Sequence, residues 1–280
     1  MKKRISLWLL KLIGVGLFIV ILSYIDREAL ISQLQNANVV LLGVSFPLVF
    51  LIYFCKTMRW KGLVNAAGIS LSLEQHWKIV NIGIFLASIS PGKIGELGKA
   101  AYLKVAGMNA GVALALSILD RLMDVAFIGL IATLGVGIFF GWEWTALLGF
   151  GMLIATLLAV ALTKKFERVT KHVPWSAAVP ASLWTIAAWL VSFLWITILA
   201  RSIGIDVPVH ILIMAFTIVG ILVLLPIAPS GLGTRDAALV FLLAPFGVPS
   251  EQAVALALLM FISIILSGIL GGWYFVKGVR

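Results

Sequence analysis

The segment from Ile227 to Leu239, IAPSGLGTRDAAL, interrupts a long apolar region with helix breakers and charges. Proline and glycine disrupt helices, and charged side chains are costly inside lipid. Such a segment is tolerated at membrane depth only where protein or a water-filled cavity surrounds it. We therefore interpret it as a functional break inside a membrane-spanning fold.

The whole chain has the composition of a polytopic membrane protein. Of its 280 residues, 62% are apolar and 11% are charged, and the mean hydropathy is +1.15. Soluble domains are about half apolar and about a quarter charged, and several apolar runs here exceed the roughly 20 residues that cross a bilayer. Because one cysteine and three scattered histidines offer no disulfide and no metal site, we expect no cofactor.

The apolar runs predict an all-α fold with about six spanning helices and two re-entrant hairpins built from broken helices. The first run is too long for a signal peptide and lacks a small-residue cleavage site, so we expect a retained helix. The hairpins surround the two Pro/Gly breaks that follow Pro91 and Pro226. The expected spans cover about residues 5–25, 38–55, 111–140, 144–163, 180–200 and 252–275.

The basic residues predict the orientation. The net charge is +10, and 16 Lys or Arg residues fall on one side of the predicted membrane, against three on the other. The positive-inside rule then places both termini in the cytoplasm. Because the basic residues form short clusters between spans, they do not indicate nucleic-acid binding. Lys93 and Lys99 are interpreted chiefly as part of this orientation signal.

The opening segment has a counterpart in the first half of the chain. PGKIGELGKAA, from Pro91, and PSGLGTRDAA, from Pro229, share Pro-x-x-[Ile/Leu]-Gly and lie 138 residues apart. Each half has three crossings, an odd number, so the second half has the inverted orientation in the membrane. We therefore predict one domain, 1–280, made of inverted repeats 1–142 and 143–280. Paired breaks in such repeats point to a transporter's central site. Alternatively, the breaks only kink ordinary helices, and residues 208–246 form two full crossings.

The candidate binding residues are charges at membrane depth and the two breaks. Asp120 and Asp124 lie one turn apart, and Arg121 can reach Asp124 at i,i+3 spacing. They form either a self-neutralising structural cluster or a site for a cationic head group or a proton. The breaks expose backbone amides that suit phosphate, which Arg235 or Arg59 would help to hold. The complete set is Arg59, Pro91, Gly92, Gly95, Glu96, Asp120, Arg121, Asp124, Pro229, Gly231, Gly233, Arg235 and Asp236.

Several motifs in their order and spacing support a family resemblance over nearly the whole chain. They are Arg59-Trp60, PGKIGE, DRLMD, and PSGLGTRDAA followed by FGVPSEQAVALALL. Together they resemble the lysylphosphatidylglycerol synthase transmembrane region, or flippase-like, family, which includes the membrane half of the bacterial multiple peptide resistance factor. The resemblance implies inverted repeats and translocation of a lipid, there an aminoacylated phospholipid, in a prokaryotic inner membrane. Because the sequence ends at Arg280, we expect no aminoacyltransferase domain, so lipid synthesis is not implied, and Asp236 stands where a glutamate is expected.

We therefore expect a flippase-like lipid transporter and not an enzyme. Its expected partners are membrane lipids of the anionic phospholipid, aminoacylated phospholipid or polyprenyl-phosphate type, with no nucleic acid and with homo-oligomerisation left open. The sequence has no G-x-x-x-x-G-K-[ST] loop, so transport is expected to be passive or ion-coupled. The alternatives are a secondary transporter of a small solute on the same architecture, and a membrane enzyme acting on lipids.

Overall fold

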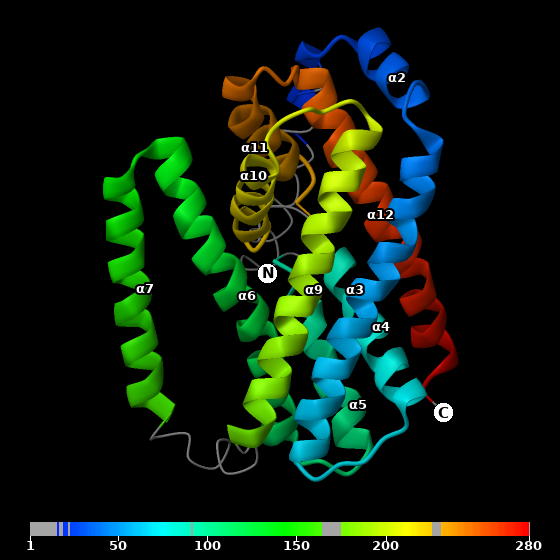
Figure 1. The fold of residues 1–280 in the computed structure, drawn as a ribbon. Helices are drawn as coiled ribbons and strands as arrows, with labels where there is room; N and C mark the ends of the chain where they lie inside the picture. Colours follow the sequence, from blue (N-terminus) through cyan, green and yellow to red (C-terminus); the bar gives the residue numbers. More distant parts are fainter. Residues whose placement is uncertain are drawn as a thin grey trace, which may run out of the picture.

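The computed structural model is a bundle of helices, and no strand occurs among the residues it describes (Figure 1). Those residues are 16, 19–21, 23–90, 92–163, 175–225 and 231–279, and the side chains of 155–163 and 175 are not included. Most of the expected span at 5–25 lies outside them. Two expected site residues, Pro91 and Pro229, lie outside them as well.

Four of the described helices are long and apolar enough to cross a membrane, so the chain is a multi-pass membrane protein. They are α3 (Val39–Ala66), α6 (Ala110–Phe140), α9 (Trp175–Ser202) and α12 (Ser250–Lys277). A further helix, α7 (Trp142–Thr163), coincides with the expected span at 144–163. The remaining described helices are α2 (Arg27–Gln35), α4 (Leu73–Ile89), η1 (Ile94–Gly98), α5 (Lys99–Val105), α10 (Val209–Leu222), α11 (Thr234–Leu243) and η3 (Ala244–Phe246).

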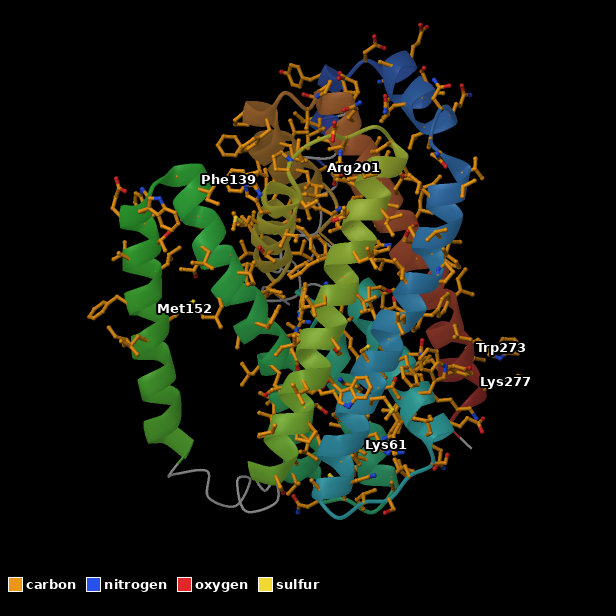
Figure 2. The ribbon with its side chains drawn as sticks, in the orientation of Figure 1. Lys61, Phe139, Met152, Arg201, Trp273 and Lys277 are labelled. Atoms are coloured by element: carbon orange, nitrogen blue, oxygen red, sulfur yellow. The ribbon has the colours of Figure 1, made fainter. Side chains whose placement is uncertain are left out.

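One predicted boundary is wrong. The span expected at 38–55 continues as α3 to Ala66, so Lys56 and Arg59 belong to a helix and not to a surface segment. The helix continues because carboxylates on α6 neutralise both cations, as the site geometry below shows. Charges that would end an isolated span are thus accommodated inside the protein. Lys61, two residues further on, lies at the opposite end of the bundle from Arg201 (Figure 2).

Local capping sets where the helices begin. Asn38 caps α3, its Oδ1 accepting hydrogen bonds from the amides of Val40 at 3.0 Å and Leu41 at 3.1 Å. Asn109 caps α6 in the same way, and Ser72 forms a reciprocal capping box with Gln75 at the start of α4. These side chains satisfy amides that have no partner within the helix. The sequence therefore fixes the helix starts locally, before any packing.

The two broken segments lie in opposite halves of the bundle. In Figure 1, α4 and α5 lie in the lower half, whereas α10 and α11 lie in the upper half. The long helices α3 and α9 pack against each other, α4 packs against α12, and α10 packs against α6. Each broken segment therefore contacts the last long helix of the other half of the chain.

Close backbone contacts hold the first broken segment in place. A Cβ added at Gly271 of α12 would lie 2.2 Å from the carbonyl oxygen of Asn81 in α4. Within the segment, a Cβ at Gly95 would lie 2.2 Å from the carbonyl oxygen of Leu86. Real Cβ atoms do not approach oxygen so closely, so only glycine allows α12 and η1 to contact α4 in this way.

Replacing Gly271 by alanine should therefore destabilise the protein. The added methyl meets backbone, which cannot rotate away, so we expect a loss of about 1–3 kcal/mol. Thermal unfolding in detergent measures the change. Gly62→Ala is the control, because Gly62 is exposed in α3 with nothing within 4 Å of its Cβ position. Equal melting temperatures for the two variants would contradict the close-packing argument.

Candidate functional site

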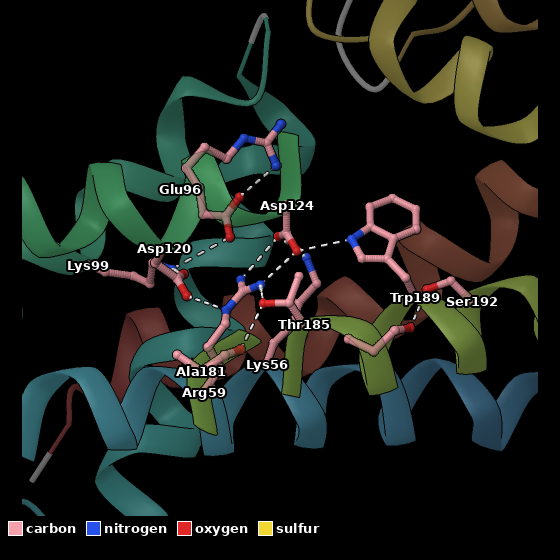
Figure 3. A network of polar contacts seen from close by, with 12 residues as sticks. Lys56, Arg59, Glu96, Lys99, Asp120, Asp124, Ala181, Thr185, Trp189 and Ser192 are labelled. Carbon is pink, nitrogen blue, oxygen red and sulfur yellow. Dashed lines mark hydrogen bonds and ion pairs between the residues drawn. The ribbon is translucent and has the colours of Figure 1, made fainter. Parts of the chain in front are cut away.

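A set of seven charged side chains, here called the buried ion cluster, joins three parts of the first half of the chain (Figure 3). Two come from α3, two from η1 and α5, and three from α6. Four are cations and three are carboxylates. The members are Lys56, Arg59, Glu96, Lys99, Asp120, Arg121 and Asp124.

Arg59 lies at the centre of this cluster and is fully buried. Its Nε donates to Asp120 at 2.7 Å, and its Nη1 donates to Asp124 at 2.8 Å. Nη1 also donates to Thr185 Oγ1 at 3.1 Å, and Nη2 donates to Asp124 at 3.1 Å. A buried charge is tolerable only when it is paired and hydrogen-bonded in this way. Arg59 therefore connects α3 to α6 and α9.

The carboxylates of the cluster are occupied by several donors each. Asp124 also accepts from Lys56 Nζ at 2.7 Å and from Trp189 Nε1 at 3.3 Å. Asp120 accepts from Lys99 Nζ as well as from Arg59. Every cation that contacts these two aspartates comes from another element, so the aspartates hold the first broken segment and α3 against α6.

The pairing expected between Arg121 and Asp124 does not form. Arg121 instead donates to Glu96 of η1 at 3.1 Å, and Lys99 Nζ lies 3.5 Å from the same carboxylate. The reason is competition, because Arg59 and Lys56 already occupy the oxygens of Asp124. Helical spacing considers only residues of the same helix, so it could not predict that cations of α3 would pair with Asp124.

The second break carries a contrasting pair of charges. Arg235 and Asp236, at the start of α11, are 1% and 0% exposed. Asp236 Oδ2 accepts from the amide of Gly233 at 2.7 Å. The guanidinium of Arg235 has no hydrogen-bond partner among the described residues, and its Cζ lies 5.6 Å from the ring centroid of Phe261. A buried arginine without a partner is rare, because its desolvation is uncompensated.

The expectation that the breaks leave free amides is wrong at two of the predicted positions. The amide of Gly95 donates to Ser90 Oγ at 2.7 Å, and that of Gly233 donates to Asp236. Side chains within each segment thus satisfy these donors, as capping residues do at helix starts. Binding of an anion at the breaks therefore depends on side chains more than on these amides.

A cavity of about 200 Å³ lies between the two halves of the bundle. Its wall is mostly apolar and comes from α3, α4, α6, α9, α10 and α12, with η1 and α11 adding charged residues. Glu96, Arg121, Asp124 and Arg235 line it. The other predicted residues that the structure describes do not line it: Arg59, Gly92, Gly95, Asp120, Gly231, Gly233 and Asp236.

Lys93 also lines this cavity, although we interpreted it from the sequence chiefly as an orientation signal. It is the one non-glycine residue of the described chain with a positive φ, 57°. Gly231, at the matching position of the second motif, has a φ of 72°. A lysine in this conformation is strained, and such strain is frequent at functional sites. Among the described residues, no acidic group forms an ion pair with Lys93, so its charge is available to a ligand.

Comparisons with known proteins agree with the family resemblance. The family model described as the lysylphosphatidylglycerol synthase TM region matches residues 8–272. A UPF0104 membrane protein of Methanocaldococcus jannaschii is 24% identical, over 97% of this chain and 95% of its own. One from Methanothermobacter thermautotrophicus is 24% identical over 81% of this chain and 80% of its own. No solved structure matches the chain.

Breaking the buried ion cluster should destabilise the protein strongly. Asp120→Asn removes the charge that pairs with both Arg59 and Lys99, and breaking a buried ion pair costs about 3–5 kcal/mol. Unfolding by SDS titration measures the change. Asp206→Asn is the control, because Asp206 pairs with Arg201 at the exposed end of α9, where an ion pair contributes about 1 kcal/mol or less. Similar losses of stability in the two variants would show that the buried ion cluster does not stabilise the fold.

Proposed function

Because this chain belongs to the lysylphosphatidylglycerol synthase TM region family, we propose that it moves a phosphate-bearing lipid between the leaflets of a membrane. In this proposal, the two broken segments are re-entrant hairpins of two inverted repeats, and both termini face the cytoplasm of a prokaryotic cell. The central cavity binds the head group, and the protein is a transporter and not an enzyme.

The packing of the helices supports the inverted-repeat part of the proposal. Exchanging the halves replaces α4 by α10 and α12 by α6, so the contact of α4 with α12 corresponds to that of α10 with α6. The same exchange relates α3 to α9, which pack against each other. Transporters with this design place their substrate site where the broken helices of the two repeats meet.

The single observation that carries the lipid proposal is Arg235. The residue lines the cavity, and its buried guanidinium has no described hydrogen-bond partner. Arginine offers several donors in a planar fork that matches phosphate oxygens, so a phosphate would offset the desolvation of this charge. Arg59, the other cation expected from the sequence, has its donors engaged by Asp120, Asp124 and Thr185 and takes no part in this proposal.

The rest of the cavity wall supports an amphiphilic substrate. Apolar side chains such as Val49, Ile128, Phe216 and Ile264 form most of its surface. A soluble ion would gain nothing from this wall, whereas the glycerol and first methylenes of a lipid would be shielded from water there. The buried ion cluster then serves to hold the first hairpin while a lipid passes.

Reconstitution into proteoliposomes tests this function. We expect the wild-type protein to exchange a fluorescent phospholipid or a polyprenyl phosphate between leaflets without nucleotide. Arg235→Gln should slow exchange about tenfold, since a charge-assisted hydrogen bond contributes about 1.5–3 kcal/mol. Arg235→Lys, which keeps the charge, should retain more activity.

The matched control is Arg201→Gln, which removes a cation from an exposed ion pair and should leave exchange unchanged. Circular dichroism and gel filtration establish that each variant is folded. Absence of exchange for every lipid tested with the wild-type protein would overturn the proposal. Uptake of a soluble anion in its place would favour the secondary transporter.

A further inference from the structure

We infer that the cavity selects a head group with two negative charges, such as a terminal phosphate, and rejects zwitterionic and aminoacylated head groups. This inference rests on the proposed function and specifies its substrate class. It follows from which charged groups around the cavity are already engaged and which are free.

No carboxylate of the cavity wall is free to bind an amine. Asp124 accepts hydrogen bonds from Lys56, Arg59 and Trp189. Glu96 accepts from Arg121 and lies near Lys99 Nζ. An ammonium group of a ligand would have to displace one of these cations and leave it buried without a partner, which is unfavourable.

The free charged groups of the cavity wall are hydrogen-bond donors, whereas Asp236 Oδ1, an acceptor without a described partner, belongs to a residue that does not line the cavity. Lys93 and Arg235 have no ion-pair partner among the described residues, and they come from the two opposed breaks. Trp195 adds a third donor, because its buried Nε1 lacks a partner in the described part of the chain and the residue lines the same cavity. Donors without acceptors suit the oxygen atoms of a phosphate, which only accept when ionised.

The balance of charge indicates how many negative charges fit. The cavity wall carries four cations and two carboxylates, an excess of two positive charges. The charged residues directly behind the wall add two cations and two carboxylates, so this excess does not change. Buried sites are most stable when their charges are compensated, and a doubly charged phosphate supplies the missing compensation. The wall residues are Lys56, Lys93, Glu96, Arg121, Asp124 and Arg235, and those behind them are Arg59, Lys99, Asp120 and Asp236.

Lipid binding to the purified protein in detergent, measured by native mass spectrometry at pH 7, tests the inference. The three probes are phosphatidic acid, phosphatidylcholine and lysylphosphatidylglycerol with identical acyl chains. A phosphomonoester carries close to two charges at this pH, because its second pKa is about 6. We expect phosphatidic acid to bind at least about tenfold more tightly than phosphatidylcholine, and lysylphosphatidylglycerol to bind most weakly.

Lys93→Gln and Arg235→Gln should each reduce this preference severalfold, and the double variant should abolish it. Lys104→Gln is the matched control, because it removes an exposed lysine of α5 that does not line the cavity. Equal affinity for the three lipids, or a preference for lysylphosphatidylglycerol, would overturn the inference. So would a preference that survives in the double variant.

Two further arms separate this inference from the proposed function. Displacement of phosphatidic acid by millimolar inorganic phosphate would support a site for a ligand with two negative charges. It would assign that site to free phosphate, which contradicts lipid transport. Conversely, proteoliposomes that exchange phosphatidylcholine as fast as phosphatidic acid would keep lipid transport and overturn the charge selectivity.

Discussion

The double engagement of Arg59 by Asp120 and Asp124 is the interaction on which the first half of the molecule depends. It places three charges inside a bundle whose long helices face lipid, and it is tolerable because nearly every donor and acceptor is used. Lys99 extends the network from Asp120 to the first broken segment, so the position of this segment follows from the position of α3. The second broken segment has no equivalent network among the described residues, and the guanidinium of its Arg235 has no described hydrogen-bond partner.

Much of the fold follows from the sequence because its determinants are local. Apolar length predicted the helices that became α6, α7, α9 and α12, and the Pro/Gly motifs located both breaks. The end of α3 was misjudged because Lys56 and Arg59 look like a surface signal until their partners on α6 are known. That partnership is tertiary, and no pattern within residues 39–66 contains it. The inverted orientation of the halves and the number of crossings stay predictions.

The site was predictable in its acidic residues and in Arg235, since charges at membrane depth are suspect by default. Its ion pairs were less predictable, because Arg121 pairs with Glu96 only when cations from another helix already occupy Asp124. Lys93 was discounted as one basic residue among many at a membrane surface. The available signal was its place in the repeat, where the second motif has glycine in a left-handed conformation. A non-glycine residue at such a position indicates a role that outweighs local strain.

The order of the charged residues along the chain has a consequence for biosynthesis. All seven members of the buried ion cluster lie between residues 56 and 124, so the set is complete once less than half of the polypeptide has been made. α9 contributes only the neutral donors Thr185 and Trp189. During insertion, the buried charges can therefore pair with one another before the second half has been synthesised. The nascent first half can neutralise itself in the membrane and serve as the template on which the second half assembles.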